Sequence, residues 1–226
     1  MKNLLRNELL GHGADVVGFA CLKGYMSGEI AHLEQAVSIG VARKLNEDTL
    51  SLLMKFQKRA VRFLKAQGYR SLAIPPDSDR KKGTFVSKLY PLFNHKMAAT
   101  SAGLGWIGKN GLLISPDYGP RLSLVTVLTD APFEQDDPTE HSLCGSCSLC
   151  AAYCPSKAIT GAEWSRSFPF VELVRLDACR SHKKAKRATD GKPNCGLCIN
   201  ICPYGREKSS MKQEYLNPEQ TQNAAV

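Results

Sequence analysis

The 226-residue sequence lacks any apolar run long enough to form a membrane helix, which needs about 18 or more successive apolar residues. The leucines of its first segment, MKNLLRNELLGHG, are interrupted by Arg6 and Glu8, so this segment does not resemble a signal peptide. Low-complexity stretches are also missing, and 43% hydrophobic with 23% charged residues is typical of globular proteins. We therefore expect a cytoplasmic globular protein with no membrane partner.

Cysteine is scarce in the first 143 residues, where Cys21 alone occurs, whereas the other eight of nine cysteines lie between residues 144 and 202. In a reducing cytosol, cysteines at this density indicate metal ligands, because disulfides are rare there. Cys21 lies in the apolar run VVGFAC, and we interpret it as a small buried hydrophobic residue.

The cysteine-rich region contains two groups that end in Cys-Pro. The first, CGSCSLCAAYCP, has the C-x2-C-x2-C-x3-C-P spacing of bacterial ferredoxins that bind [4Fe–4S] clusters. The second, CGLCINICP, lacks the leading cysteine, and Cys179 is the free candidate to replace it. In such motifs three thiolates on a tight loop hold one cluster, while the cysteine before proline reaches the neighbouring cluster. This predicts one cluster at Cys144, Cys147, Cys150 and Cys202, and a second at Cys154, Cys179, Cys195 and Cys198.

Zinc is the alternative cofactor, since paired C-x2-C motifs also bind zinc. Zinc would leave the repeated extra cysteine and proline without a role, so we favour two clusters. The formal net charge of +9 suggests an anionic partner. Two thiolate-ligated clusters contribute about −4 when oxidised, so the loaded protein carries about +5 and the case for nucleic acid weakens.

Apolar periodicity and capping residues predict mixed helices and strands before the cysteines. We expect an α+β fold with helices over 1–10, 46–67 and 85–101, and strands over 15–21, 35–41, 69–75, 111–115 and 121–129. Residues 131–143 are rich in proline and acidic residues, which marks a boundary near them. We assign residues 1–135 to an α/β domain, 136–208 to a cluster module and 209–226 to a polar tail.

A glycine-rich segment, AGLGWIGKNG, occupies residues 102–111. It matches G-x-G-x-x-G and nearly matches a P-loop, but both motifs need a preceding strand and a following helix. Here the predicted order is the reverse, so we do not expect a nucleotide site. The alternative to a cofactor site is a tight structural turn around a buried tryptophan.

Together with the strand RLSLVTVLTD and the two cysteine groups, the segment AGLGWIGKNGLLISPDYG resembles epoxyqueuosine reductases and the related reductive dehalogenases. The resemblance covers about residues 95–205 and implies a nitroreductase-like scaffold beside a ferredoxin-like module with two clusters. It also implies a cobalamin that receives electrons from the clusters. About 20 residues follow the last cluster cysteine, too few for the helical-repeat extension of the tRNA-modifying enzymes. The residues implied at the cofactor side are Gly103, Gly105, Trp106, Gly108, Lys109 and Asn110.

The proton donor departs from the pattern of the tRNA-modifying enzymes, whose acidic donor lies about a dozen residues before the glycine segment. The corresponding stretch here has no carboxylate between Ser87 and Ser101. Tyr90 and His95 are the candidates to replace it, since the dehalogenases use a tyrosine. The alternative for Tyr90 is a half-buried packing residue.

Three functions compete. The first is a corrinoid-dependent reductase acting on a small or nucleoside-like substrate, the second an electron carrier without activity of its own, and the third an RNA-binding iron–sulfur protein. The basic run RSHKKAKRATDGK at 180–192 suits the third, but it lacks interleaved aromatic residues for base stacking. We interpret this run as a solvated cationic loop and expect an acidic electron donor, such as a flavodoxin or ferredoxin. Nucleic acid is disfavoured as a partner.

Overall fold

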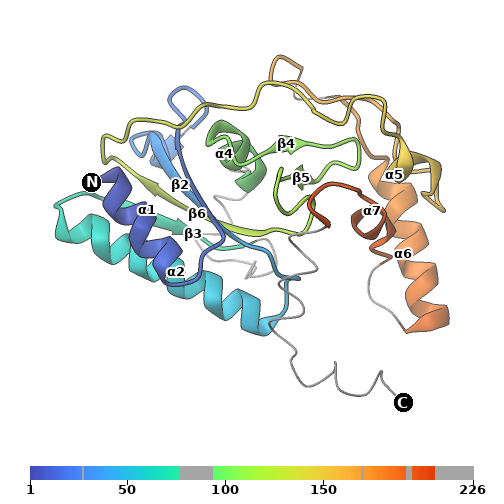
Figure 1. The fold of residues 1–226 in the computed structure, drawn as a ribbon, viewed down its shortest axis with the longest axis horizontal. Coiled ribbons are helices and arrows are strands. Elements are labelled where there is room, and N and C mark those ends of the chain that lie inside the picture. Colours follow the sequence, from blue (N-terminus) through green and yellow to red (C-terminus); the bar gives the residue numbers. More distant parts are fainter. Residues whose placement is uncertain (27, 77–93, 169–170, 192–194, 207–226) are drawn as a thin grey trace. The chain divides into compact units, whose positions relative to one another are not determined.

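The computed structural model describes residues 1–26, 28–76, 94–168, 171–191 and 195–206 (Figure 1). These residues form a mixed α/β structure, as the sequence predicted, and the chain divides into two compact units. The first unit comprises residues 1–106 and 122–140. The second comprises residues 107–121 and the described residues from 141 onward, so a segment that the sequence assigned to the first domain is grouped with the cysteines. No described helix is long and apolar enough to cross a membrane.

A four-stranded antiparallel sheet in the order β1-β2-β6-β3 lies at the centre of the first unit. Strands β2 and β6 pair along their whole length, because each is buried on both faces and carries an almost continuous apolar run. The strands span β1 (Val16–Cys21), β2 (Gln35–Val41), β3 (Ser71–Ile74) and β6 (Ser123–Thr129).

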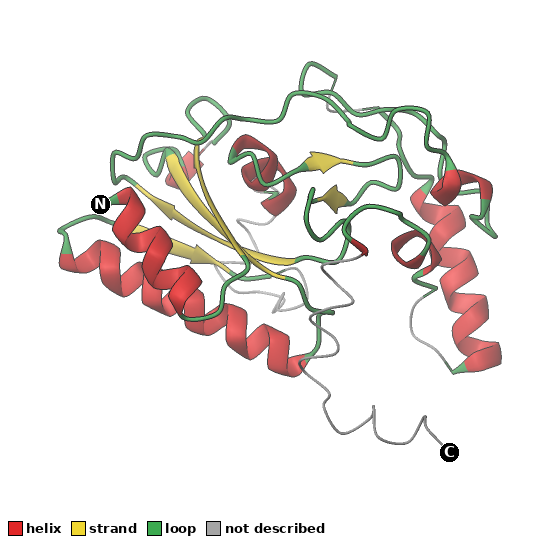
Figure 2. Cartoon of the chain, viewed as in Figure 1, coloured by secondary structure: helices red, strands yellow, loops and turns green. Residues whose placement is uncertain are grey.

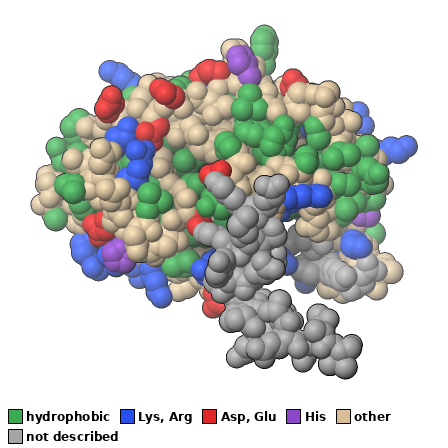
Figure 3. All heavy atoms as spheres, in the orientation of Figure 1, with side chains coloured by type: hydrophobic (Ala, Val, Ile, Leu, Met, Phe, Trp, Pro, Cys, Tyr) green, Lys and Arg blue, Asp and Glu red, His purple; other side chains and the backbone are tan. Residues whose placement is uncertain are grey.

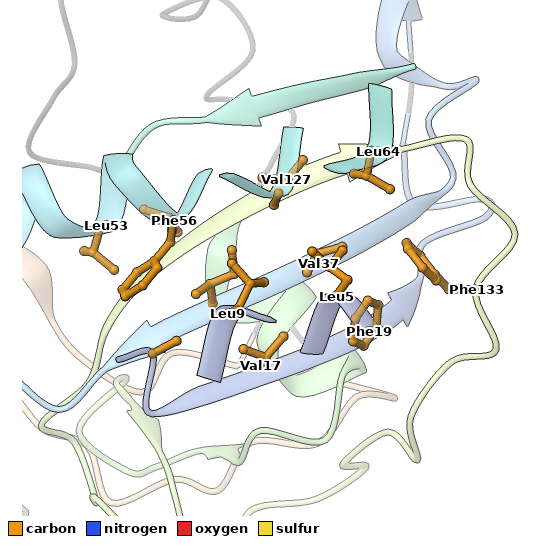
Figure 4. Close-up of a cluster of buried hydrophobic side chains, with 14 of the residues drawn as sticks. Leu5, Leu9, Val17, Phe19, Val37, Leu53, Phe56, Leu64, Val127 and Phe133 are labelled. Carbon is orange, nitrogen blue, oxygen red and sulfur yellow. The ribbon is translucent and has the colours of Figure 1, made fainter. Parts of the chain in front are cut away.

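Helices α1 (Lys2–Gly11) and α2 (Glu47–Ala66) cover one face of this sheet (Figure 1). Helix α2 begins as predicted, since the Asn46 side chain accepts a hydrogen bond of 2.8 Å from the Thr49 N–H. Its apolar stripe packs on alternate residues of the strands to form the main core. Figure 4 shows these side chains converging between the helices and the sheet: Leu5, Leu9, Val17, Phe19, Val37, Leu53, Phe56, Leu64, Val127 and Phe133.

The other face of the sheet packs against η1 (Gly28–Ile30) and helix α4 (His95–Ser101). A side chain at Gly18 of β1 would meet Ala102 at 2.8 Å, so this glycine permits the close approach of the end of α4. The helix predicted over 85–101 is seen from His95, and residues 85–93 lie outside the described residues. Cys21, expected to be buried, is half-buried at the end of β1.

The second unit has short elements apart from one long helix, α6 (Leu176–Asp190), which Figure 2 shows in red. The basic run 180–192 was expected to be a loop, and that expectation was wrong: the run is helical as far as Asp190, and Gly191 ends the helix with a φ of 67°. The remaining elements are β4 (Trp106–Ile107), β5 (Leu113–Ile114), α5 (Leu149–Ala152) and α7 (Leu197–Asn200).

Candidate metal centre

The two cysteine groups share two local features. The first cysteine of each is followed by a glycine with positive φ, Gly145 at 52° and Gly196 at 67°, a conformation that other residues adopt at a cost. A one-turn helix then follows, and α5 carries Cys150 as α7 carries Cys198.

Four thiols from both groups surround one hollow, whose empty volume is about 300 Å³ including the part that is open to solvent. Three of these thiols come from the first sequence motif and the fourth from the end of the second, which is the crossed arrangement that the Cys-Pro pattern predicts. The hollow is lined by Lys109, Asn110, Ile114, Cys144, Cys147, Leu149, Cys150, Cys202, Pro203 and Tyr204.

The thiols at this hollow influence one another electrostatically. Burial, and then the neighbouring thiolates, raise the pKa of Cys150 to about 11. Burial also raises the pKa of Cys202, against the opposing effects of the Tyr204 backbone N–H and the Arg121 charge. Burial thus disfavours the thiolate form of Cys150 and Cys202, and a metal cluster would supply the positive charge that favours this form.

The second quartet shows the same coupling. Burial raises the pKa of Cys198 most, the neighbouring Cys179 and Cys195 raise it further, and Cys154 adds the smallest contribution. These four cysteines are the set that the sequence assigns to the second cluster, although the role of each as a ligand stays a prediction.

Cys154 differs from the other thiols of its quartet. Burial acts to raise its pKa, but hydrogen bonds from the Ser156 hydroxyl and from backbone N–H groups outweigh this and lower it. The Ala158 N–H lies 3.3 Å from the Cys154 sulfur. N–H groups directed at cysteine sulfur are what iron–sulfur clusters use to stabilise their thiolate ligands.

The donor set therefore fits a cluster. A [4Fe–4S] cubane takes one thiolate on each of four irons and so suits four thiols spread around a hollow.

Two side chains of the glycine segment contact the cysteine loops. The Lys109 ammonium donates hydrogen bonds to the carbonyl oxygens of Gly145 (2.6 Å) and Cys147 (3.2 Å) in the first group. The Asn110 amide donates to the Cys198 carbonyl of the second group over 3.3 Å. Adjacent residues of one turn thus hold both cysteine groups, a role that the sequence did not reveal.

Arg121 is a further site residue that sequence reasoning missed. Its guanidinium donates to the carbonyl oxygens of Tyr204 (2.8 Å), Ile199 (3.1 Å) and Cys202 (3.1 Å). Burial lowers its pKa, Cys202 raises it and Arg206 lowers it further. A side chain at Gly119 would collide with the Tyr204 carbonyl, so the turn before Arg121 lies directly against the chain after Cys202. The only sequence signal was a cation at the end of the turn SPDYGPR.

Of the other residues predicted to face a corrinoid, Gly105, Trp106 and Gly108 are buried, whereas Gly103 is exposed. Trp106 is 2% exposed. A side chain at Gly103, whose φ is 65°, would collide with the Asp137 carbonyl, and one at Gly108 would lie 2.7 Å from Ile114. These close contacts, with the Asp137 backbone and the Ile114 side chain, explain why glycine stands at 103 and 108. Contact of this segment with a cofactor stays a prediction.

The two candidate proton donors have different outcomes. Tyr90 lies outside the described residues. His95 is buried, and its Nδ1 lies 2.9 Å from the Thr126 hydroxyl while its Nε2 lies 2.9 Å from the Pro75 carbonyl. Both ring nitrogens are thus engaged in joining α4 to the sheet, which is a structural role. Proton donation by either residue stays a prediction.

Comparison with protein families supports the assignment of the cofactor. Residues 143–205 match the family model of the 4Fe-4S double cluster binding domain. The match covers both cysteine groups and agrees with the two quartets in the structure. The prediction of two [4Fe–4S] clusters is confirmed.

Curated relatives agree with this result. The chain is 33% identical over 125 residues to an epoxyqueuosine reductase of Lactococcus garvieae, a match covering 54% of this chain and 34% of the relative. It is 38% identical over 119 residues to an epoxyqueuosine reductase of a Synechococcus species, covering 49% and 34%. The match to these relatives thus spans about a third of their length.

Solved structures extend the likeness to most of the chain. A crystal structure of epoxyqueuosine reductase matches with a TM-score of 0.67 and 18% identity, covering 92% of this chain and 66% of that one. A reductive dehalogenase structure associated with B12-dependent dehalogenation matches with a TM-score of 0.62 and 18% identity, covering 90% and 32%. The resemblance to both groups is confirmed, and at this identity the structures show the fold alone.

One of the matching structures bears on the expected partners. It is an epoxyqueuosine reductase with a tRNA stem loop, with a TM-score of 0.66, 18% identity and coverage of 92% of this chain and 66% of that one. This finding stands against the expectation that disfavoured nucleic acid, because a protein of the same fold is seen with RNA.

Proposed function

We propose that the chain is an iron–sulfur oxidoreductase similar to the epoxyqueuosine reductases, with its reductive activity in residues 1–135 and an electron-supplying module in residues 136–208. The observation that carries this proposal is the pair of cysteine quartets in one compact unit. For residues 1–135 we propose a nitroreductase-like scaffold, supported by the antiparallel sheet that is covered on both faces.

The residues of this chain have definable tasks in such a protein. When bound, a [4Fe–4S] cluster supplies one-electron transfer at low potential. The first would be held by Cys144, Cys147, Cys150 and Cys202, and the second by Cys154, Cys179, Cys195 and Cys198. Lys109, Asn110 and Arg121 fix the loops that carry these thiols, and the backbone N–H of Ala158 stabilises a thiolate at Cys154.

A corrinoid is the proposed second cofactor, and its support is the likeness to a B12-associated dehalogenase. The structure gives it less support than the clusters. Trp106 is enclosed, and Lys109 and Asn110 are hydrogen-bonded to the cysteine loops. We therefore derive no step through a corrinoid, and treat its uptake as a measurement that divides the candidate functions.

The experiment is anaerobic purification with iron and zinc analysis, followed by absorption spectra before and after adding cobalamin. The proposal expects about eight irons per chain, reducible with dithionite, and a stoichiometric corrinoid band. Zinc in place of iron would overturn it. Eight irons without corrinoid uptake and without reduction of an epoxyqueuosine-containing RNA or nucleoside would favour the alternative, an electron carrier without catalytic activity.

The proposed electron donor is an acidic protein such as a flavodoxin or ferredoxin. Helix α6 carries the cationic residues Arg180, Lys184 and Arg187 on exposed positions, and the same helix carries Cys179 of the second quartet. An anionic redox protein docked on α6 would thus lie next to one cluster. Charge reversal at Lys184 should slow cluster reduction by flavodoxin at low salt, whereas an unchanged rate together with weakened tRNA binding would show that α6 binds RNA instead.

A further inference from the structure

Lys109 combines burial, charge and specific contacts in a way that no other feature of the glycine segment does. Its side chain is 11% exposed, and its ammonium donates to two carbonyl oxygens of the first cysteine loop, at Gly145 and Cys147. Gly145 lies between the predicted ligands Cys144 and Cys147, and Cys147 is itself one of them. The lysine therefore fixes the path of the loop that presents Cys144 and Cys147.

The same side chain lines the hollow that the four thiols surround. Its carboxylate neighbour, Glu163, lies 3.3 Å from the ammonium but is 50% exposed, so water screens that partner more strongly than it screens the buried lysine. Positive charge thus remains beside the hollow. In a partly buried site a charge acts over a longer range than in water.

The second quartet is held differently. The glycine segment reaches it through Asn110, a neutral amide that donates to the Cys198 carbonyl. Cys154 receives hydrogen bonds from the Ser156 hydroxyl and a backbone N–H. These dipoles are directed at single atoms and carry no net charge, whereas Lys109 adds a full positive charge to the first site.

We propose that Lys109 is a positioning residue that fixes the first cysteine loop and raises the reduction potential of the cluster held by Cys144, Cys147, Cys150 and Cys202. The proposal rests on the clusters of the proposed function. A reduced cluster carries one more negative charge than an oxidised one, so a nearby cation favours the reduced form. Adding an electron to this cluster creates charge that Lys109 stabilises without any rearrangement.

The test compares reduction potentials in the loaded protein, measured by redox titration followed by electron paramagnetic resonance. Lys109→Gln keeps a hydrogen-bond donor for the loop but removes the charge. We expect about eight irons and a reduction equilibrium about tenfold less favourable for one cluster, which is 59 mV for one electron. Lys58→Gln removes the same charge from an exposed position on α2 and should leave both potentials unchanged.

Glu163→Gln provides an independent test with the opposite sign. Because it removes the negative neighbour of Lys109, it should make reduction of the same cluster about threefold more favourable, a smaller effect since Glu163 is half exposed. This surface change does not remove a loop contact, so it remains informative where Lys109→Gln loses iron. Loss of only the first cluster in Lys109→Gln, with a raised potential in Glu163→Gln, would also support the proposal.

Unchanged potentials in Glu163→Gln, or a Lys109→Gln protein with eight irons and wild-type potentials, would overturn the inference. Neither result would affect the proposed function, because the clusters would still be present. A wild-type protein that binds no iron would instead contradict the proposed function itself. A Cys144→Ser background, which lacks the first cluster, shows which cluster Lys109 affects. In that background Lys109→Gln should leave the reduction potential of the second cluster unchanged.

Discussion

The two units of this protein are stabilised by different means. In the first, both faces of the sheet bury apolar side chains in two continuous clusters. Exposed large apolar side chains occur in both units, among them Leu4 and Tyr25 in the first and Leu143 and Phe168 in the second (Figure 3 shows hydrophobic side chains at the surface of the viewed face). The difference is that the second unit buries fewer apolar side chains. Among the described residues, its buried apolar side chains are Ile107, Leu113, Ile114, Ala158, Ile159, Trp164 and Cys202.

This difference indicates what holds each unit in its fold. Burial of apolar surface contributes roughly 25 cal/mol per Å², so the first unit has a core that can stabilise it by itself. The second unit has little such core, and its loops are joined by hydrogen bonds from Lys109, Asn110 and Arg121 and by shared cysteine sites. Because metal binding in small sites is coupled to folding, we infer that the second unit needs its clusters.

The largest expected effect comes from removing a cluster ligand. Cys198→Ser should lose one cluster, leaving about four of eight irons, and the part of the second unit around the lost cluster, α6 included, should lose its structure while the first unit stays folded. Iron analysis gives the cluster content, and hydrogen exchange gives the two units separately, with slow amides retained in β2 and β6 and lost in α6.

Cys21→Ser is the matched control, because it makes the same chemical change in β1 of the first unit. It should keep both clusters. Retention of all eight irons in Cys198→Ser would show that Cys198 is not a ligand. Equal loss of hydrogen-exchange protection in both units would show that the second unit does not depend on the clusters more than the first.

The sequence predicted much of this arrangement where short-range chemistry decides the outcome. The cap at Asn46 and the strand 35–41 follow from local sequence, and the cysteine spacing places Cys144, Cys147, Cys150 and Cys202 in one predicted quartet, the four thiols that line one hollow. The roles of Lys109 and Arg121 could not be predicted, since they depend on which loops meet residues 107–121 in three dimensions. The basic run of α6 was misjudged because its charge suggested a loop, whereas lysine, arginine and alanine all favour helix.

Truncating a core side chain of the first unit should have the opposite effect to Cys198→Ser: it should destabilise the first unit and leave the clusters in place. Phe56 of α2 is 2% exposed in the main core, and Phe56→Ala should cost about 3–5 kcal/mol of that unit's free energy of unfolding. The iron content and cluster spectrum should stay unchanged. Denaturant unfolding followed by hydrogen exchange in β2 measures the loss. Leu4→Ala, at a 67% exposed position on α1, is the control and should cost little.

The smallest expected effect tests whether charge interactions add to the stability that apolar burial gives the first unit. The Asp136 carboxylate accepts hydrogen bonds from Lys2 (2.8 Å), Arg6 and the Phe19 N–H (2.9 Å). Burial acts to raise its pKa, but these partners outweigh it and hold the pKa below the usual value of about 3.9.

The stabilisation by Asp136 is therefore present above about pH 3.9 and is lost as the pH falls through the lower pKa of the folded state. We expect about 1 kcal/mol or less, since the site is partly exposed. Hydrogen exchange of β1 amides at falling pH should show this loss in the wild type and not in Asp136→Asn, and identical pH profiles would show that apolar burial alone sets the stability of this unit.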